Sequence, residues 1–422
     1  MKELIKHMTP RAVLGAYHLV LAYLGALFYG FPAKNLFVIA VTGTKGKSTT
    51  VELIDAILRE AGYTTAVAST IRFAIGGTSE PNLYKMTMPG RFFLQQFLRK
   101  AVSKKATHAI IEMTSEGAAQ FRHKGIELDA LVFTNLAPEH LESHGGLENY
   151  VAAKLSLAKH LEESAKRPRY IVANADDKYG KDFLATKVEV CTPFSLTDAE
   201  PYNATDRGVR FVWRRGELFT VPLPGVFNLK NVLAALVLCE AMDIPLPTIK
   251  KALERMPAIA GRAERVEQGQ PFTVVVDYAH TPDSLKALYE TYGPSSTPGV
   301  KRKLVCVLGS TGGGRDTWKR PRMGEIADQF CDIAFLTDED PYDEDPQKII
   351  ADIVKGFVKH KPHIIRDRAK AIREALKEAG EGDAVLITGK GTDPCICRAH
   401  GTKEPWSDRK VAQEQLKKLG YH

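Results

Sequence analysis

Cysteines are few in this sequence, and their positions suit neither a disulfide framework nor a zinc site. The 422 residues include six cysteines. Cys239, Cys306 and Cys331 lie in apolar runs, which is typical of small core residues. Cys395 and Cys397 form a Cys-x-Cys pair, but no second pair lies at zinc-ribbon spacing. We therefore expect no structural zinc, no disulfide bonds and a reducing, cytoplasmic compartment.

Long hydrophobic runs are also scarce, apart from one near the amino terminus. Residues 12–31 (AVLGAYHLVLAYLGALFYGF) contain no Asp, Glu, Lys or Arg. That length just suffices to span a bilayer, but the run includes His18 and three glycines and leads almost directly into a core strand. No small-residue cleavage site follows it, so we expect no signal peptide. The sequence favours a helix packed on the protein over a membrane-surface or partner-binding helix, and both over a membrane span.

Fixed-period repeats, low-complexity tracts and basic patches interleaved with aromatic residues are absent from the sequence. These absences argue against a solenoid, a disordered tail and a nucleic-acid-binding surface. The net charge is nevertheless +8, and the isoelectric point is about 9.0. Because the basic residues are spread along the chain, we expect a solvated basic surface and no nucleic-acid partner. An anionic substrate or an anionic membrane would suit the same charge.

Two blocks of alternating strands and helices are the main pattern that the sequence does contain. The first block has apolar runs expected to form buried strands at residues 36–41, 109–113, 130–134 and 170–173. The second block has such runs at residues 273–278, 303–309, 333–337 and 384–389. Helical patterns separate these runs, which predicts doubly wound parallel sheets. Residues 208–224 instead mix aromatic, β-branched and turn residues, so we expect an antiparallel hairpin there.

The same pattern predicts the domain organisation, because 422 residues suffice for two or three domains. We expect an α/β protein with a P-loop, doubly wound central domain and a second, Rossmann-like α/β domain. The main boundary is placed near residues 257–261. The predicted parts are an apolar extension at residues 1–35, a central domain at 36–258 and a carboxyl-terminal domain at 259–422.

A glycine-rich loop follows the first expected strand and opens a helix. Its sequence is GTKGKS, residues 43–48, and its glycines let backbone N–H groups turn towards phosphate oxygens at a helix N-terminus. Lys47 would neutralise phosphate charge, and Ser48 would be a ligand for Mg²⁺. The loop alone leaves kinase, GTPase, ligase and motor open. The residues expected to hold the nucleotide phosphates are Gly43, Thr44, Lys45, Gly46, Lys47, Ser48 and Thr49.

The TGTKGKS form of this loop resembles the P-loop of Mur ligases and folylpolyglutamate synthetases. Further stretches agree with that family at matching spacing: EMTSEG (112–117), FTNLAPEHLESHG (133–145), NYVAAKLSL (149–157), LPGVFNLKNVLAAL (223–236), GRAERV (261–266), VVDYAHTPDSL (275–285), KRPRMG (319–324), DRAKAI (367–372) and GKGTD (389–393). The resemblance runs from about residue 36 to the carboxyl terminus. VVDYAHTPDSL, KRPRMG and GKG are similar to the branch that adds the third residue of the peptidoglycan stem peptide, the UDP-N-acetylmuramyl-tripeptide synthetases.

The resemblance implies a ligase that makes an amide bond with ATP. The acceptor carboxylate would attack the γ-phosphate of ATP, and an amine would then displace phosphate from the acyl-phosphate. The catalytic groups in the implied site are Lys47, Lys154, His140 and Arg262. Two Mg²⁺ ions would be held by Ser48, Glu112, His140 and Lys154. The resemblance further implies that CO₂ converts Lys154 to a carbamate, which turns a cation into an anion.

The family pattern also implies which residues contact the nucleotide and the substrates. Asn228 and Asn231 would read the adenine edge, although two Asn residues would by themselves more often cap helices or turns. Asp277 and Arg262 would reach the nucleotide from the second domain, which would also bind the amino acid. Substrate contacts are implied for Thr87, Ser115, Asp338, Asp340, Tyr342, Gly389 and Asp393.

Four features depart from the family pattern. Only about 35 residues precede the first strand, where tripeptide-forming ligases usually have a domain that holds the UDP-sugar. Lys45 and Glu116 stand where this branch usually has Asn and His. Tyr342 replaces an Arg that grips a carboxylate in diaminopimelate enzymes, and acidic residues stand beside it. We therefore expect an acidic pocket, with Asp393 as one member, that favours a diamine such as lysine or ornithine over diaminopimelate.

The predicted partners are small molecules, namely ATP, an amino acid and a muramyl-peptide precursor, and the expected state is a monomer. Two alternatives stay open. The same mechanism would serve another acceptor, such as a folate, a cyanophycin-like chain or a lipid-linked muropeptide. Alternatively, the chain would be an ATP-binding subunit whose catalytic half lies on another protein. The presence of Glu112, His140 and Lys154 together argues against such a dead site.

Overall fold

The structure is a computed structural model that describes residues 11–139, 141–293 and 302–422. The chain divides into two compact units, which are described separately. Unit 1 consists of Met1–Tyr202, Phe211–Val221 and Asn228–Met256, and unit 2 consists of Asn203–Arg210, Pro222–Phe227 and Pro257–His422. Within the described ranges, no helix is both long and apolar enough to cross a membrane.

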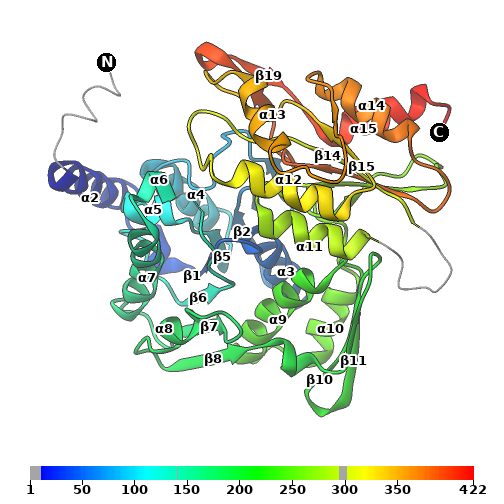
Figure 1. Ribbon diagram of the computed structural model, residues 1–422. Helices are drawn as coiled ribbons and strands as arrows, with labels where there is room; N and C mark the ends of the chain where they lie inside the picture. Colours follow the sequence, from blue (N-terminus) through cyan, green and yellow to red (C-terminus); the bar gives the residue numbers. More distant parts are fainter. Residues whose placement is uncertain (1–10, 140, 294–301) are drawn as a thin grey trace. The chain divides into compact units, whose positions relative to one another are not determined.

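A mostly parallel sheet of eight strands forms the centre of unit 1 (Figure 1). The strands lie in the order β4-β3-β2-β5-β1-β6-β7-β8. Their bounds are β1 Phe37–Thr42, β2 Thr65–Ala68, β3 Arg72–Ile75, β4 Thr78–Pro81, β5 His108–Glu112, β6 Ala130–Phe133, β7 Tyr170–Asn174 and β8 Val190–Phe194. β3, near one edge, pairs in an antiparallel manner with both β2 and β4, and the other pairs of this sheet are parallel. The apolar runs that predicted strands are buried on both faces of this sheet, as is typical of parallel strands.

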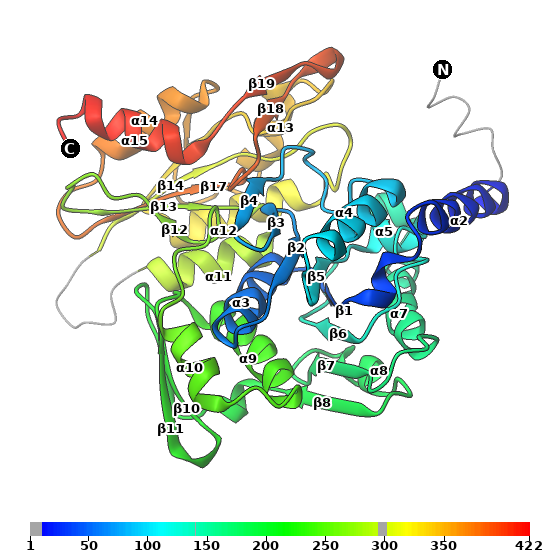
Figure 2. The same ribbon diagram turned by 180° about the vertical axis from the view of Figure 1, so that it is seen from behind.

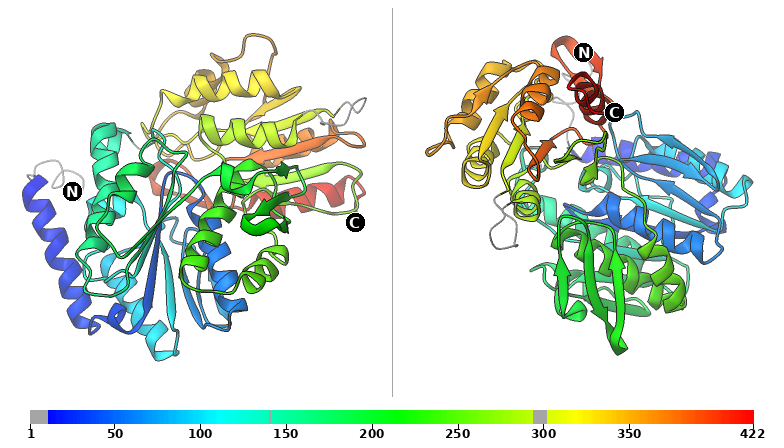
Figure 3. Two further views of the ribbon diagram at one scale, coloured as in Figure 1. Left: turned by 90° about the horizontal axis from the view of Figure 1, so that it is seen from below. Right: turned by 90° about the vertical axis from the view of Figure 1, so that its right-hand side faces the viewer.

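Helices cover both faces of this sheet, as Figures 2 and 3 show. On one face, α4 and α7 pack in a core with Val38 and Ala40 of β1. On the other face, α3 packs against β1, β2 and β5. The bounds are α3 Lys47–Glu60, α4 Arg91–Ser103, α5 Ser115–Ala119, α6 Leu141–His144, α7 Leu147–Glu162, α8 Gly180–Leu184, α9 Val226–Ala241 and α10 Leu246–Glu254.

The apolar run near the amino terminus forms a helix, α2 Arg11–Phe28, followed by the short 3-10 helix η1 Pro32–Asn35. α2 packs on α4 of unit 1. The expected hairpin is also confirmed, because β10 Val209–Trp213 and β11 Glu217–Val221 are neighbours in a three-stranded sheet with β9 Tyr202–Ala204.

Unit 2 contains a second doubly wound sheet, in the order β12-β13-β17-β14-β15-β16. Its strands are β12 Glu264–Arg265, β13 Thr273–Asp277, β14 Leu304–Leu308, β15 Ile333–Leu336, β16 His363–Ile364 and β17 Ala384–Thr388. One face is covered by α11 Pro282–Tyr292, α12 Lys319–Phe330 and α13 Pro346–Val354. The other face is covered by α14 Arg368–Lys377 and α15 Asp408–Lys418. A small pair, β18 Cys395–Cys397 and β19 Lys403–Pro405, follows β17. The α/β class predicted from the sequence is confirmed.

The expectation of no disulfide bond was wrong. Cys306 on β14 is bonded to Cys331, which follows α12, and their Cα atoms lie 6.1 Å apart. Both residues are buried in the core, as expected, but the strand and the helix end bring two thiols together that are 25 positions apart in the chain. Cys239, Cys395 and Cys397 are buried.

Candidate functional site

The loop between β1 and α3 is shaped by two glycines. Gly46 is the N-cap of α3 and has a φ of 81°, and Gly43 has a φ of 150°. A Cβ atom at Gly46 would overlap Asn231 Oδ1, and one at Gly43 would overlap Thr134 Oγ1. Both positions therefore require glycine for conformation and for space. The loop places the unpaired N–H groups of a 14-residue helix at its N-terminus, which is a binding site for anions such as phosphate.

The side chains of Lys47, Ser48 and Glu112 meet at the start of this helix. Ser48 Oγ donates a hydrogen bond to Glu112 Oε2 over 2.9 Å. Lys47 Nζ lies 3.9 Å from Glu112 Oε1. Glu112 ends β5, next to β1 in the sheet, and only 2% of its surface is exposed. A hydroxyl and a buried carboxylate at a phosphate-binding helix fit Mg²⁺, which prefers oxygen ligands.

The segment after β6 holds the phosphate loop in place. Lys45 N donates to Asn135 Oδ1 over 2.9 Å, and Asn135 Nδ2 donates back to Lys45 O over 3.0 Å. Thr44 Oγ1 lies 2.8 Å from the hydroxyl of Tyr150 on α7. Lys45 Nζ forms an ion pair with Glu139 at 3.0 Å. This lysine, which departs from the family pattern, therefore ties the loop to the segment that precedes His140.

Lys154 projects from α7 into the base of the same loop. Its Nζ donates to Gly43 O over 2.7 Å, and only 2% of the residue is exposed. Burial, reinforced by the nearby charges of Lys47 and Lys45, holds the pKa of Lys154 well below its usual range, and Glu139 opposes this effect. The amine of Lys154 therefore loses its proton more readily than that of an exposed lysine.

The two asparagines of α9 lie against the phosphate loop. Asn228 and Asn231 are both buried, and Asn231 Nδ2 donates to Asn228 Oδ1 over 3.2 Å. Asn231 therefore occupies the space beside Gly46 of the phosphate loop. Thr49, on the first turn of α3, is buried as well.

The residues expected to contact the acceptor lie near this cluster. Thr87 Oγ1 is 2.7 Å from Thr70 Oγ1, and the backbone N–H of Thr70 donates to Glu112 Oε2 over 2.9 Å. Ser115 Oγ lies 3.1 Å from His144 Nε2. His140, expected to be a metal ligand, lies outside the described residues. Among the residues that are described, no group of three or more His, Cys, Asp or Glu is arranged to hold a metal.

In unit 2, Asp277 organises the turn after β13. Its carboxylate accepts hydrogen bonds from the backbone N–H groups of Ala263 and Ala279, over 2.6 and 2.7 Å. The guanidinium of Arg262 lies 4.6 Å from the centre of the Tyr278 ring. Arg262 and Asp277 are thus brought together within unit 2, as expected of residues that serve one site.

The acidic loop after β15 carries its own counter-ions, which the sequence analysis did not foresee. Lys390 Nζ lies 2.9 Å from both carboxylate oxygens of Asp340 and 3.2 Å from Asp393 Oδ2. Asp338 Oδ2 pairs with Arg398 at 3.1 Å. Lys390 and Asp340 are both buried. The expected acidic pocket is therefore largely neutralised by cations of the chain itself, and Asp340 joins the loops that follow β15 and β17.

Glu339 is a buried acid that the sequence analysis did not single out. Its Oε1 accepts a hydrogen bond from Thr311 Oγ1 over 2.8 Å, whereas Oε2 has no hydrogen-bond partner in the described part of the chain. Gly389 leaves space for this carboxylate, because a Cβ there would overlap Oε2. A Cβ at Gly309 would lie 2.9 Å from Glu339 Cβ. Glu339 therefore lies at the carboxyl ends of β14 and β17, where such sheets bind ligands.

Tyr342, three residues further on, adopts a left-handed backbone with a φ of 51°. Its N–H donates to Cys397 O over 3.0 Å, and the guanidinium of Arg315 lies 5.3 Å from its ring centre. Arg315 belongs to a glycine-rich loop after β14 and was also missed in the sequence. The sequence could have predicted this loop, because a Gly-Gly-Gly-Arg run at residues 312–315, directly after a strand end, is typical of a ligand-binding loop.

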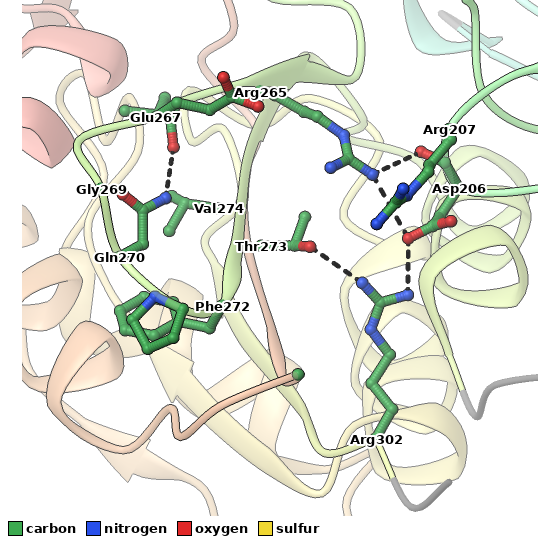
Figure 4. Close-up of a pocket in the computed structure, with 13 residues that line it drawn as sticks. Asp206, Arg207, Arg265, Glu267, Gly269, Gln270, Phe272, Thr273, Val274 and Arg302 are labelled. Carbon is green, nitrogen blue, oxygen red and sulfur yellow. Dashed lines mark hydrogen bonds and ion pairs between the residues drawn. The ribbon is translucent and has the colours of Figure 1, made fainter.

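Unit 2 also contains a cavity of about 440 Å³ near the start of β13 (Figure 4). Arg302 Nη1 lies 2.8 Å from Asp206 Oδ2, and Arg265 Nη2 donates to Asp206 O over 2.9 Å. These contacts fasten residues 203–210 to β12 and β13. None of the expected site residues is among its described lining residues, and Asp206 pairs with two of its three arginines, Arg265 and Arg302.

Comparison with known proteins identifies the family. The Mur ligase middle domain matches residues 41–239, and the Mur ligase, glutamate ligase domain matches residues 261–391. The chain belongs to the Mur ligase family. It is therefore an ATP-dependent ligase, and the family implies that it uses Mg²⁺.

Two relatives extend this match over most of the chain. A UDP-N-acetylmuramyl-tripeptide synthetase of Roseiflexus sp. is 38% identical, over 95% of this chain and 82% of the relative. A UDP-N-acetylmuramoyl-L-alanyl-D-glutamate–2,6-diaminopimelate ligase of Syntrophomonas wolfei is 36% identical, over 94% and 81%. The resemblance to tripeptide-forming ligases is therefore confirmed.

Solved structures show the same architecture. A UDP-N-acetylmuramoyl-L-alanyl-D-glutamate–2,6-diaminopimelate ligase matches with a TM-score of 0.61 and 30% identity, over 92% of this chain and 79% of that chain. A Mycobacterium tuberculosis folylpolyglutamate synthase matches with a TM-score of 0.71 over 96% of both chains. At 15% identity, the second likeness concerns the fold alone.

Proposed function

We propose that this ligase joins one amino acid to a carboxylate of the terminal D-glutamate of UDP-N-acetylmuramoyl-L-alanyl-D-glutamate. The observation that carries the proposal is the 36–38% identity, over more than nine-tenths of this chain, to relatives named for that acceptor or for the tripeptide product. A carboxylate oxygen of the acceptor bonds to the γ-phosphorus of ATP, and ADP leaves. The amine nitrogen then attacks the acyl carbon, loses a proton, and phosphate leaves.

The phosphate loop of unit 1 supplies the positive potential that this transfer needs. Lys47 and the N-terminal amides of α3 would hold the phosphate oxygens. Ser48 and Glu112 would hold Mg²⁺, which neutralises charge on the transferred phosphoryl group. Their 2.9 Å hydrogen bond keeps the hydroxyl and the carboxylate side by side, which supports this assignment.

We further propose that Lys154 is carbamylated and completes a second Mg²⁺ site together with His140. The neutral amine that burial favours is the form that reacts with CO₂, giving a carbamate and releasing one proton. The resulting anion would lie near Lys45 and Lys47, whose charges oppose the ammonium form of Lys154 but favour a carbamate. Carbamylation would thus replace repulsion from these two lysines by attraction to them.

For the amino acid, we propose that Glu339 selects a cationic group. Asp338, Asp340 and Asp393 already form ion pairs with Lys390 or Arg398. Glu339 lies near the charge of Arg368, but that guanidinium is bound to Asp408, so Glu339 is the acid of this loop that we assign to a substrate amine. Its Oε2 is buried and has no hydrogen-bond partner within the described ranges, a state that a bound ammonium group would relieve. The exposed guanidinium of Arg315 would hold the carboxylate of the same amino acid.

The test is ligation by the purified full-length protein with ATP, Mg²⁺, UDP-N-acetylmuramoyl-L-alanyl-D-glutamate and single amino acids. We expect the acceptor to gain the mass of one amino acid minus water, with lysine and ornithine preferred over diaminopimelate. Ligation of an amino acid without a second amine, at equal rate, would contradict the role of Glu339. Ligation to a folate or another carboxylate, but not to this acceptor, would contradict the proposed acceptor.

A further inference from the structure

The outer face of α2 carries a concentration of exposed apolar side chains. Eighteen large apolar residues are exposed in the described part of the protein, and seven of them lie on this one helix. They include Leu27, 65% exposed, and Phe28, 75% exposed. Six of the seven recur at spacings of three or four and therefore share one side of the helix, here called the outer face: Val13, Tyr17, Val20, Leu24, Leu27 and Phe28.

The fully buried residues of α2 are small, and Leu14, Leu19 and Leu21 are half-buried. Ala22 and Ala26 are fully buried, and a Cβ added at Gly125 would lie 2.6 Å from Ala26 Cβ. A Cβ at Gly25 would lie 3.5 Å from the ring of Phe92. Figure 2 shows α2 at the edge of unit 1 beside α4 and α5. A helix stabilised only by packing on its own protein buries most of its large apolar residues, whereas seven large residues of α2 are exposed.

Basic residues outnumber acidic ones around α2, although α5 contributes one exposed acid, Glu116. α2, η1 and the helix α4 that packs on them contain no Asp or Glu. They contain five basic residues, namely Arg11, Lys34, Arg91, Arg99 and Lys100. Lys104 and Lys105 follow α4 directly and are exposed. Elsewhere acids nearly balance bases, since the whole chain has 50 Asp and Glu against 58 Lys and Arg.

We propose that the outer face of α2 binds the surface of an anionic lipid membrane. An exposed apolar helix face flanked by cations is the pattern of helices that lie in the headgroup region, with the apolar side chains in the acyl boundary. Tyr17 and Tyr23 suit that region, where aromatic rings with a polar tip are enriched. The basic residues add attraction to anionic headgroups. A second copy of the chain is a poorer occupant, because two cationic surfaces would repel each other.

Flotation of the full-length protein with vesicles tests this proposal. We use phosphatidylcholine vesicles with and without about one third phosphatidylglycerol, at about 0.1 M and about 0.5 M NaCl. The protein should float with the anionic vesicles, and at least severalfold less with neutral vesicles or at the higher salt concentration. Absence of flotation with anionic vesicles would overturn the proposal.

The double variant Leu24→Glu/Leu27→Glu identifies the surface involved. Both side chains are exposed, so the variant should keep its circular dichroism spectrum, its thermal midpoint and its ligase activity with water-soluble substrates. We expect its affinity for anionic vesicles to fall by roughly tenfold or more for each substitution. Val358→Glu/Ile364→Glu is the matched control, because it makes the same charge change on exposed apolar residues of unit 2.

Equal flotation of the wild type and the α2 variant would overturn the assignment to this face. Equal loss in the control would show that only net charge matters, and would overturn it as well. Light scattering without lipid measures whether the protein is a monomer or a dimer. A lipid-independent dimer of the wild type that becomes monomeric in the α2 variant would identify a second copy as the occupant and contradict the membrane proposal. The test does not depend on the acceptor or the amino acid of the ligase.

Discussion

The proposed carbamate of Lys154 makes the rate of ligation depend on pH and on CO₂. Because carbamate formation consumes the neutral amine and releases a proton, it is favoured by higher pH and by added CO₂. At constant CO₂ we therefore expect ligation to fall as the pH is lowered through the range where Lys154 becomes protonated, and bicarbonate to restore part of the loss. Measuring initial rates across pH, with and without bicarbonate, checks this dependence.

Substitution of the same residue gives a sharper test. Lys154→Ala should reduce the rate of ligation at least about 100-fold, as expected when a group that stabilises transferring charge is lost. Short carboxylic acids such as acetate should restore part of the activity. Lys159→Ala is the matched control, because this lysine is exposed on the same helix. Full activity of Lys154→Ala without added acid would contradict the carbamate.

Glu339 provides the second prediction at the residue scale. Glu339→Gln keeps the size of the side chain but removes its charge. We expect KM for the amino acid to rise about 10- to 100-fold, the range for loss of a buried charged hydrogen bond, with little change in KM for ATP. Glu325→Gln, at a surface ion pair of the same unit, is the control. An unchanged KM for the amino acid would remove Glu339 from the site.

The β1–α3 element depends on glycine at its N-cap. In Gly46→Ala, the added Cβ would overlap Asn231 Oδ1, and the φ of 81° would also be unfavourable. Gly62, near the other end of α3, has a φ of 88° but nothing within 4 Å of an added Cβ. We expect Gly46→Ala to lose ATP binding by calorimetry. Gly62→Ala should lose only about 1 kcal/mol of stability and keep its affinity for ATP. Equal ATP affinity in both variants would contradict this view of the loop.

Strand β5 contributes a pH-dependent term to stability through its first residue. Burial lowers the pKa of His108 to about 4, and its ring lies 4.3 Å from that of Tyr63. In the unfolded chain the pKa is about 6.5. Between these values only the unfolded state is protonated, so stability is lost as the pH falls from 6.5 towards 4, by up to about 3 kcal/mol. Denaturant unfolding of His108→Phe should show a smaller decrease over this range than the wild type. An identical decrease would contradict the assignment.

At the scale of elements, the sequence predicted most of what lies within a short stretch of chain. Apolar runs such as residues 130–134 became strands because burial on both faces of a parallel sheet requires them. The phosphate loop and Glu112 were predicted because a strand end and a helix start lie next to each other in the chain. The Asp340–Lys390 pair and the Cys306–Cys331 bond were not predicted, since each joins elements that only the fold brings together.

At the scale of the whole molecule, each of the two units is built from segments that are not continuous in the chain, and composition did not predict this division. Residues 203–210 and 222–227 belong to unit 2, although they are flanked by segments of unit 1. Asp206 explains part of this division, because two arginines of unit 2 clamp it. The local sequence of residues 203–210 does not differ in pattern from that of the β10–β11 hairpin that follows, so it could not predict that these residues belong to unit 2.

Nucleotide binding should stabilise the whole molecule. A ligand at about 100 times its Kd adds about 2.7 kcal/mol to the stability of the state that binds it. We therefore expect ATP with Mg²⁺ to raise the thermal midpoint of the wild type in differential scanning fluorimetry. Lys47→Ala should lose most of that rise, whereas Lys159→Ala should keep it. If Lys47→Ala kept the full rise in thermal midpoint, the nucleotide would bind at a site other than the phosphate loop.

The most direct test of the central claim follows one oxygen atom. UDP-N-acetylmuramoyl-L-alanyl-D-glutamate is prepared with ¹⁸O in both carboxylates of its D-glutamate and incubated with the protein, ATP, Mg²⁺ and the preferred amino acid. Because an acyl-phosphate transfers one carboxylate oxygen to phosphorus, we predict one ¹⁸O atom in the released phosphate for every amide bond formed. Phosphate without ¹⁸O, or no phosphate release that depends on this acceptor, would contradict the account.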